Sequence, residues 1–126
     1  MIETALFNVL STSSAITALA GTRIYPAVLP TDPTLPALTY RTVAAPVRPT
    51  MSTRGIQKSR VQIDCYGDTF AAAVTLRDAV VQTLAGHSDA NFQSQILDTG
   101  PDGWDHDLLQ YVAICEATLW HSFWKI

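Results

Sequence analysis

Histidine and aspartate are the side chains of this chain that most readily do chemistry, and their spacing forms no known catalytic motif. The three histidines, His87, His106 and His121, are far apart, and each stands beside a turn or a chain end. The sequence contains no G-x-S-x-G, H-E-x-x-H, G-x-x-x-x-G-K-[ST] or G-x-G-x-x-G pattern. We therefore predict no catalytic residues and no enzyme. The remaining enzymatic alternative is a site in which His106 and an aspartate or second histidine converge in space.

An acidic turn offers the best set of oxygen ligands for a metal ion. Calcium loops place oxygen ligands at close alternating positions, but here Gly100 and Trp104 occupy alternate positions. We predict a solvated turn and no metal, with a site that includes His106 as the lesser alternative. The carboxylates of this turn are Asp98, Asp102, Asp105 and Asp107.

The two cysteines are expected to be structural. Cys65 and Cys115 are fifty residues apart, form no C-x-x-C pair and lie within apolar runs typical of strands. We predict two buried, reduced thiols rather than a disulfide or a redox site, and no cofactor.

Size and composition favour a single domain that contacts other proteins. The chain has 126 residues, 13.7 kDa and 48% hydrophobic residues, which suits one domain over residues 1–126. Charged residues make up 15%, against about 25% in typical domains, so we expect surface buried against partners. The net charge of −3 argues against a dedicated nucleic-acid binder. No apolar run reaches the ~20 residues of a membrane span, and the N-terminus lacks the pattern of a secretory signal.

Basic residues are concentrated in one part of the chain. The window between Asp32 and Asp64 contains no acid but holds five of the eight basic residues. We predict that Arg48, Arg54 and Lys58 lie on a long loop over residues 44–58, because this segment is rich in proline and glycine. Such a loop would line a lumen or a docking surface, meeting phosphate or the acidic turn of a neighbouring subunit. The alternative is two solvated loops of opposite charge.

The C-terminus is unusually aromatic. Trp120, Phe123 and Trp124 lie within a few residues of one another, whereas chain ends are normally polar. Either these rings return to the sheet as core, or they anchor a partner or a neighbouring subunit. We take all three as interface candidates and expect Trp120 to contribute to the core, because it continues a strand.

Hydrophobic periodicity indicates the elements that would position these residues. An amphipathic helix is predicted over residues 2–10, and a helical turn over 15–20 that Ser13 or Ser14 caps and Gly21 ends in the left-handed conformation. A longer helix begins at Asp68 or Thr69 and ends at Gly86. Strands are predicted over residues 23–25 (an edge strand), 37–43, 60–66, 92–97 and 108–119.

The order of these elements predicts an α+β fold. We expect a mostly antiparallel sheet with the helices packed on one face and a long loop between two strands. The strand over residues 108–119 is apolar on both faces, with Val112, Ile114 and Trp120 on one of them. A strand of this kind is covered on both faces. The helices would cover one face, and a neighbouring subunit is a candidate for the other.

In sequence, the chain resembles the tail-completion proteins of long-tailed phages, also called tail terminator or tail-to-head joining proteins. Four segments in the same order carry the resemblance: IETALFNVLSTSSAITALAG, the proline-rich TRIYPAVLPTDPTLPALTYRTV, the strand and helix RVQIDCYGDTFAAAVTLRDAVVQTL, and a closing strand after an acidic turn. The second and third segments are the specific ones, and the match covers nearly the whole chain.

This resemblance implies a structural function in the virion tail or neck, after assembly in the host cytoplasm. Proteins of this family form a ring, usually hexameric, on the head-proximal end of the tail tube. The ring ends tube growth and joins the tail to the head. The implied partners are other copies of the chain, the tail tube protein and the head connector or neck proteins. DNA passes only transiently through the lumen, and no membrane is involved.

Two other functions remain as alternatives. The first is a connector or closure protein on the head side of the neck. The second, less favoured, is a small nucleic-acid-binding module that uses the basic loop.

Overall fold

The computed structural model describes residues 2–30, 34–44, 56–89, 92–100, 103–105 and 110–122. Within these ranges the helices alternate with groups of strands, as the sequence predicts. The helices are α1 (Ile2–Thr12), α2 (Ser14–Ala20) and α3 (Phe70–Leu84). The strands are β1 (Ile24–Pro26), β2 (Ala37–Ala44), β3 (Ile56–Gly67), β4 (Gln93–Thr99), β5 (Gly103–Asp105) and β6 (Gln110–Ser122).

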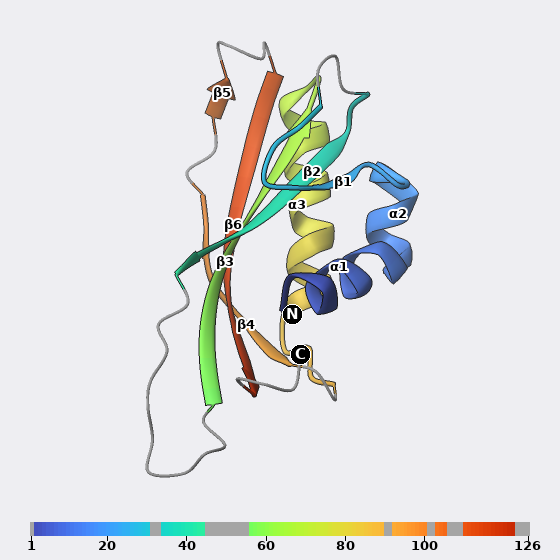
Figure 1. Cartoon of the computed structure of the whole chain (residues 1–126). Helices are drawn as coiled ribbons and strands as arrows, with labels where there is room; N and C mark the ends of the chain where they lie inside the picture. The colour runs from blue at the N-terminus through green and yellow to red at the C-terminus, as the bar shows by residue number, and fades with distance from the viewer. Residues whose placement is uncertain are drawn as a thin grey trace.

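The strands form a six-stranded, mostly antiparallel sheet. Its order is β1-β2-β3-β6-β4, and β5 pairs with the first residues of β6. Only β1 and β2 run parallel. Figure 1 shows all three helices on one side of the sheet, with α3 running along β3 and β6. The α+β fold with helices on one face is confirmed.

The core lies between this face of the sheet and the helices. Residues of β3 and β6 alternate in burial, so that Ile63 and Cys115 are fully buried and lie directly opposite each other. From the helices, Leu6, Leu10 and Leu76 complete the core. The apolar face of each element therefore points to one shared layer.

Local signals explain where α3 begins and ends. The Thr69 hydroxyl accepts a hydrogen bond of 3.1 Å from the Ala72 N–H, which satisfies one of the free donors of the first turn. Gly86, with φ of +69°, follows the last turn. The apolar side of α3 is buried from Ala73 to Leu84, whereas Phe70, the first residue of the helix, is 50% exposed.

The break between α1 and α2 differs in one respect from the prediction. Ser13 occupies the N-cap position of α2, but its side chain makes no capping hydrogen bond. Its hydroxyl instead pairs with the Thr83 hydroxyl of α3 at 2.8 Å. The capping prediction for Ser13 is wrong because the hydroxyl ties α2 to α3 instead. Gly21 has the expected positive φ of 59°, although its ψ of −123° lies outside the left-handed helical region.

Strand β3 is longer than the sequence indicates. It begins at Ile56 rather than at residue 60, because β6 extends to Ser122 and pairs with it there. Lys58 therefore lies in a strand, opposite Trp120, and its placement on a loop is wrong. The part of the predicted basic loop between β2 and β3, residues 45–55, lies outside the described residues.

Candidate interaction surfaces

Two histidines form polar contacts, but neither contact has the form of an active site. The Ser59 hydroxyl and the Nε2 atom of His121 are 2.7 Å apart, and both side chains are buried on the helix-covered face of the sheet. His87 contacts Asp89 at 2.7 Å in the turn after α3. Because Ser59 is fully buried, a substrate cannot reach its hydroxyl in this conformation. His106, on which the enzymatic alternative depends, lies outside the described residues.

The described ranges also offer no metal site and no reactive thiol. These ranges contain no cluster of three or more histidine, cysteine, aspartate or glutamate side chains able to hold a metal ion. Cys65 and Cys115 are free and buried. Burial raises the pKa of the Cys115 thiol to about 12; the nearby Arg77 lowers this pKa by less, and Asp64 and Glu116 raise it further. Such a thiol stays protonated and unreactive at neutral pH.

The sheet face opposite the helices is lined by side chains that pair along and across the strands. Arg60 of β3 forms an ion pair of 3.1 Å with Glu116 of β6. On the same face of β3, the Gln62 amide donates a 2.8 Å hydrogen bond to Asp64. We call this surface, which continues to Lys58 and Trp120 at the ends of β3 and β6, the open face.

Trp120 is the most prominent apolar side chain of the open face. Its neighbours Leu119 and His121 are buried on the helix-covered face, so the alternation of the strand points Trp120 the other way. It is 41% exposed, and the Lys58 ammonium lies 5.2 Å from the centroid of its ring. The expectation that Trp120 belongs to the core is wrong, because the helices cover only the other face. The pair instead forms an exposed cation–π contact.

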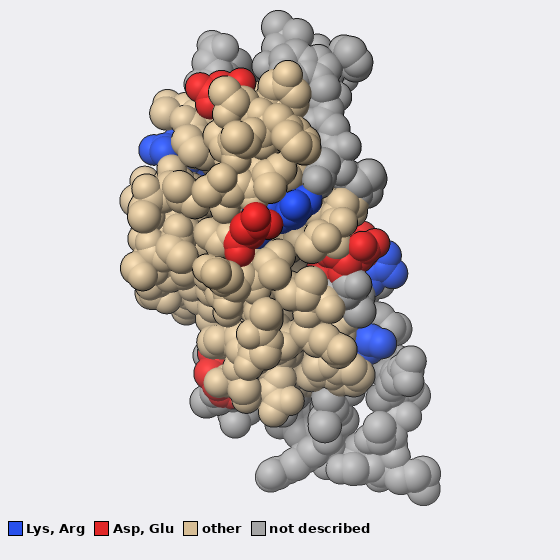
Figure 2. All heavy atoms as spheres, turned by 180° about the vertical axis from the view of Figure 1, so that it is seen from behind, with Lys and Arg blue, Asp and Glu red and all other residues tan. Residues whose placement is uncertain are grey.

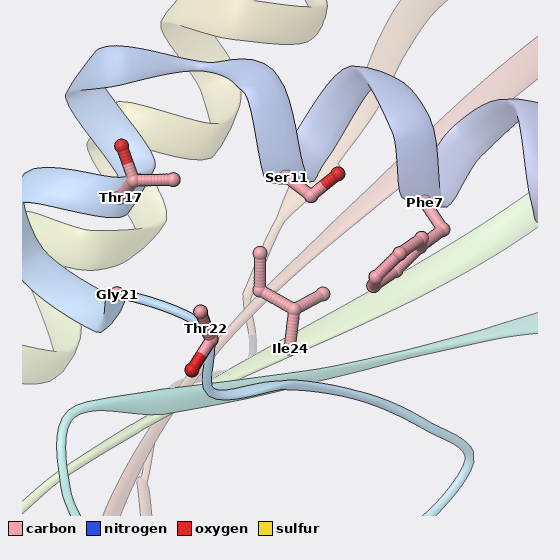
Figure 3. Close-up of a pocket in the computed structure, with 6 residues that line it drawn as sticks. All are labelled: Phe7, Ser11, Thr17, Gly21, Thr22 and Ile24. Carbon is pink, nitrogen blue, oxygen red and sulfur yellow. The ribbon is translucent and has the colours of Figure 1, made fainter.

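A hollow of about 240 Å³ opens between α1, α2 and β1 (Figure 3). Phe7 forms one wall, its ring 6.2 Å from that of Tyr40, and the buried Ile24 forms the floor. The Ser11 hydroxyl donates to the Asn8 carbonyl and the Thr17 hydroxyl donates to the Ser13 carbonyl; in Figure 3 the Thr17 methyl group, rather than its hydroxyl, points toward the hollow. The lining is completed by Gly21 and Thr22.

The described surface carries few charges. Figure 2, which views the molecule from behind relative to Figure 1, shows a mostly uncharged face with small separate groups of acidic and basic side chains. The described residues of that face form no broad basic patch of the kind that binds nucleic acid.

The structure brings together only some of the residues predicted for interfaces. Lys58 and Trp120, predicted for different surfaces, lie side by side. Arg48, Arg54, Phe123 and Trp124 lie outside the described residues. The hollow could not be predicted from the sequence, because its walls come from two helices and an edge strand that meet only in the folded chain.

Together, the fold and these surfaces define a small structural protein with faces suited to protein contacts. The model of the family described as Tail completion protein gp17 matches residues 4–116, and the chain belongs to this family. It is therefore a structural protein of a phage-like virion tail. Among the described residues, no helix is long and apolar enough to cross a membrane.

A solved structure shares the fold. A chain in the structure titled "Virion of native gene transfer agent (GTA) particle" superposes with a TM-score of 0.73 at 17% sequence identity. The match covers 93% of this chain and 91% of that chain. At this identity the likeness shows the fold alone. A comparison with curated proteins finds no match.

Proposed function

We propose that the protein forms a ring on the head-proximal end of a phage tail tube, with six subunits as is usual for its family. The ring ends tube growth and joins the finished tail to the head. The observation that carries this proposal is the family match over residues 4–116. The open face supports it, because the helices leave that side of the sheet, with its exposed Trp120, available to other subunits.

Within this ring, we assign each chain the role of one subunit, with residues 1–126 as a single domain. Trp120 and Lys58, together with Phe123 and Trp124, belong to a contact with a neighbouring subunit or with the tail tube protein. Arg48 and Arg54 line the lumen or the surface that meets the head connector. DNA passes through the lumen during ejection without stable binding, in keeping with the net charge of −3.

Deletion of the gene from its phage, followed by electron microscopy of the lysate, tests the proposal. Overlong or unjoined tails beside filled heads are expected, and a plasmid copy of the wild-type gene should restore joined virions. Leaky or empty heads beside tails of normal length would instead assign the protein to the head side of the neck. Normal virions would refute a function at either position.

A further inference from the structure

The exposed tryptophan and the hollow lie on different parts of the same chain, and they match in size and chemistry. We propose that Trp120 of one subunit inserts into the hollow between α1, α2 and β1 of the next subunit. This inference rests on the proposed ring and assigns its subunit contact to named side chains.

The volume of the hollow suits one large aromatic side chain. A cavity of about 150 Å³ is sufficient to hold a benzene molecule, and pockets for drug-sized ligands begin at about 300 Å³. At about 240 Å³ the hollow lies between these limits. An indole ring is larger than benzene, so it fills the hollow better than a phenyl ring does.

The polar groups of the hollow also favour tryptophan. Because the Ser11 hydroxyl, which lines the hollow, donates to the Asn8 carbonyl at 3.3 Å, its lone pairs remain available to accept from a guest. The indole N–H of tryptophan is a donor without acceptor capacity. An indole buried against the walls formed by Phe7 and Ile24 therefore meets both an apolar surface and, in the Ser11 hydroxyl, an acceptor for its single polar group.

Charges of both signs lie near the hollow, and the acidic one is opposite in sign to the lysine that contacts Trp120. This lysine is Lys58. Glu3 lies one helical turn before Phe7, on the same side of α1, and accepts a hydrogen bond from Thr42. The basic residue beside the hollow, Arg23, donates to two carbonyl oxygens, those of Pro36 and Leu19. An inserted Trp120 would bring the Lys58 ammonium toward the Glu3 carboxylate, which favours correct orientation of the subunits.

A contact between two different surfaces of one chain also has the symmetry that a ring requires. Trp120 projects from the open face. The hollow lies between α1, α2 and β1, on the side of the sheet that carries the helices (Figures 1 and 3). Such a head-to-tail contact repeats from subunit to subunit, and closes into a ring when the rotation permits. A two-fold symmetric dimer would instead bring the same surface of both chains together.

Photo-crosslinking identifies the residues that position 120 contacts in assembled tails. The photoreactive amino acid p-benzoyl-phenylalanine replaces Trp120 in the full chain, and tails form from a mixture of ¹⁵N-labelled and unlabelled subunits. After irradiation, adducts between differently labelled chains are expected within residues 1–23, which contain most of the hollow. The same amino acid in place of Asp78, which is exposed on α3, is the control and should give no adduct in this segment.

Substitutions on both sides of the contact provide a second measurement. Trp120→Ala should weaken association between subunits about 30-fold or more, as truncation of a central tryptophan commonly does. Ser11→Phe, which fills the hollow from the exposed side of α1, should cause a similar loss. Lys58→Glu and Glu3→Lys should each weaken association, and the double variant should recover much of it. Circular dichroism checks that every variant is folded.

Three results would overturn the inference. These are inter-subunit adducts that lie only outside residues 1–23, adducts only to the tail tube protein, and normal association of both Trp120→Ala and Ser11→Phe. Failure of the proposed Trp120 contact can be distinguished from failure of the proposed function. Unjoined tails after gene deletion, together with normal rings from these two variants, would refute only the contact. Normal virions after deletion would refute the ring itself.

Discussion

The junction between β3 and α3 allows one substitution to be analysed quantitatively. Gly67 is the last residue of β3, and the chain passes so close to the first turn of α3 that no side chain fits there. A Cβ atom at this position would lie 2.7 Å from the Ala73 nitrogen and 3.0 Å from the Thr69 oxygen, both backbone atoms. Because the helix cap fixes this backbone, the backbone can shift away from an added Cβ atom only at a cost in folding free energy. We therefore expect Gly67→Ala to reduce the free energy of unfolding by about 2 kcal/mol, as overpacked sites do.

Gly86→Ala is the matched control, since it adds the same methyl group at the other end of α3. Gly86 has no heavy atom within 4 Å of the added Cβ, but its φ is +69°. Gly86→Ala should therefore reduce the free energy of unfolding by about 1 kcal/mol, because alanine is strained at a positive φ. For a chain of this length these values correspond to losses in Tm of roughly 8 and 4 °C.

Urea unfolding followed by circular dichroism measures both variants, with an unchanged m-value as the sign that the native and denatured states remain comparable. The reasoning about close packing would be refuted if Gly67→Ala reduced the free energy of unfolding by no more than Gly86→Ala does. It would also be refuted if Gly67→Ala were as stable as the wild type.

Two further predictions concern the buried thiols and the start of α3. Neither Cys65 nor Cys115 should react with a thiol reagent at pH 8 until denaturant is added, and fast labelling of the native protein would contradict their burial. Because the pKa of Cys115 is raised from 9.0 to about 12 on folding, the folded chain keeps a proton that the unfolded chain loses. The free energy of unfolding should therefore fall as pH rises from about 9 to 12, and Cys115→Ala should reduce this slope. Thr69→Ala removes the cap of α3 and should cost about 1 kcal/mol in urea unfolding, whereas Thr69→Ser should retain most of the stability.

Much of the fold could be predicted because local signals and tertiary packing agree. Helix α3 is the clearest case: its apolar residues recur with helical spacing, Thr69 offers a capping oxygen and Gly86 follows the last turn. The strand alternation of Val61, Ile63 and Cys65 likewise matches their burial.

The misjudged features depend on partners far away in the sequence. Residues 56–59 show little apolar alternation, and they join β3 only because the distant end of β6 pairs with them. Trp120 was assigned to the correct face of its strand, yet no signal in the sequence shows that the helices leave this face uncovered. Ser13 was expected to act within its own helix, but its nearest hydroxyl partner is Thr83, seventy residues later. Side chains of this kind acquire their roles only from the tertiary fold.

The position of β6 in the sheet has a consequence for how the chain folds during synthesis. This strand is the last of the described elements in chain order, yet it lies between β3 and β4 and also pairs with β5. Until the ribosome has made it, β3 has only β2 as a partner and β4 has no long strand beside it. Pairing across such separations closes large loops and is intrinsically slow. The sheet therefore completes only after β6 has been synthesised, and newly made chains expose unpaired strand edges until then.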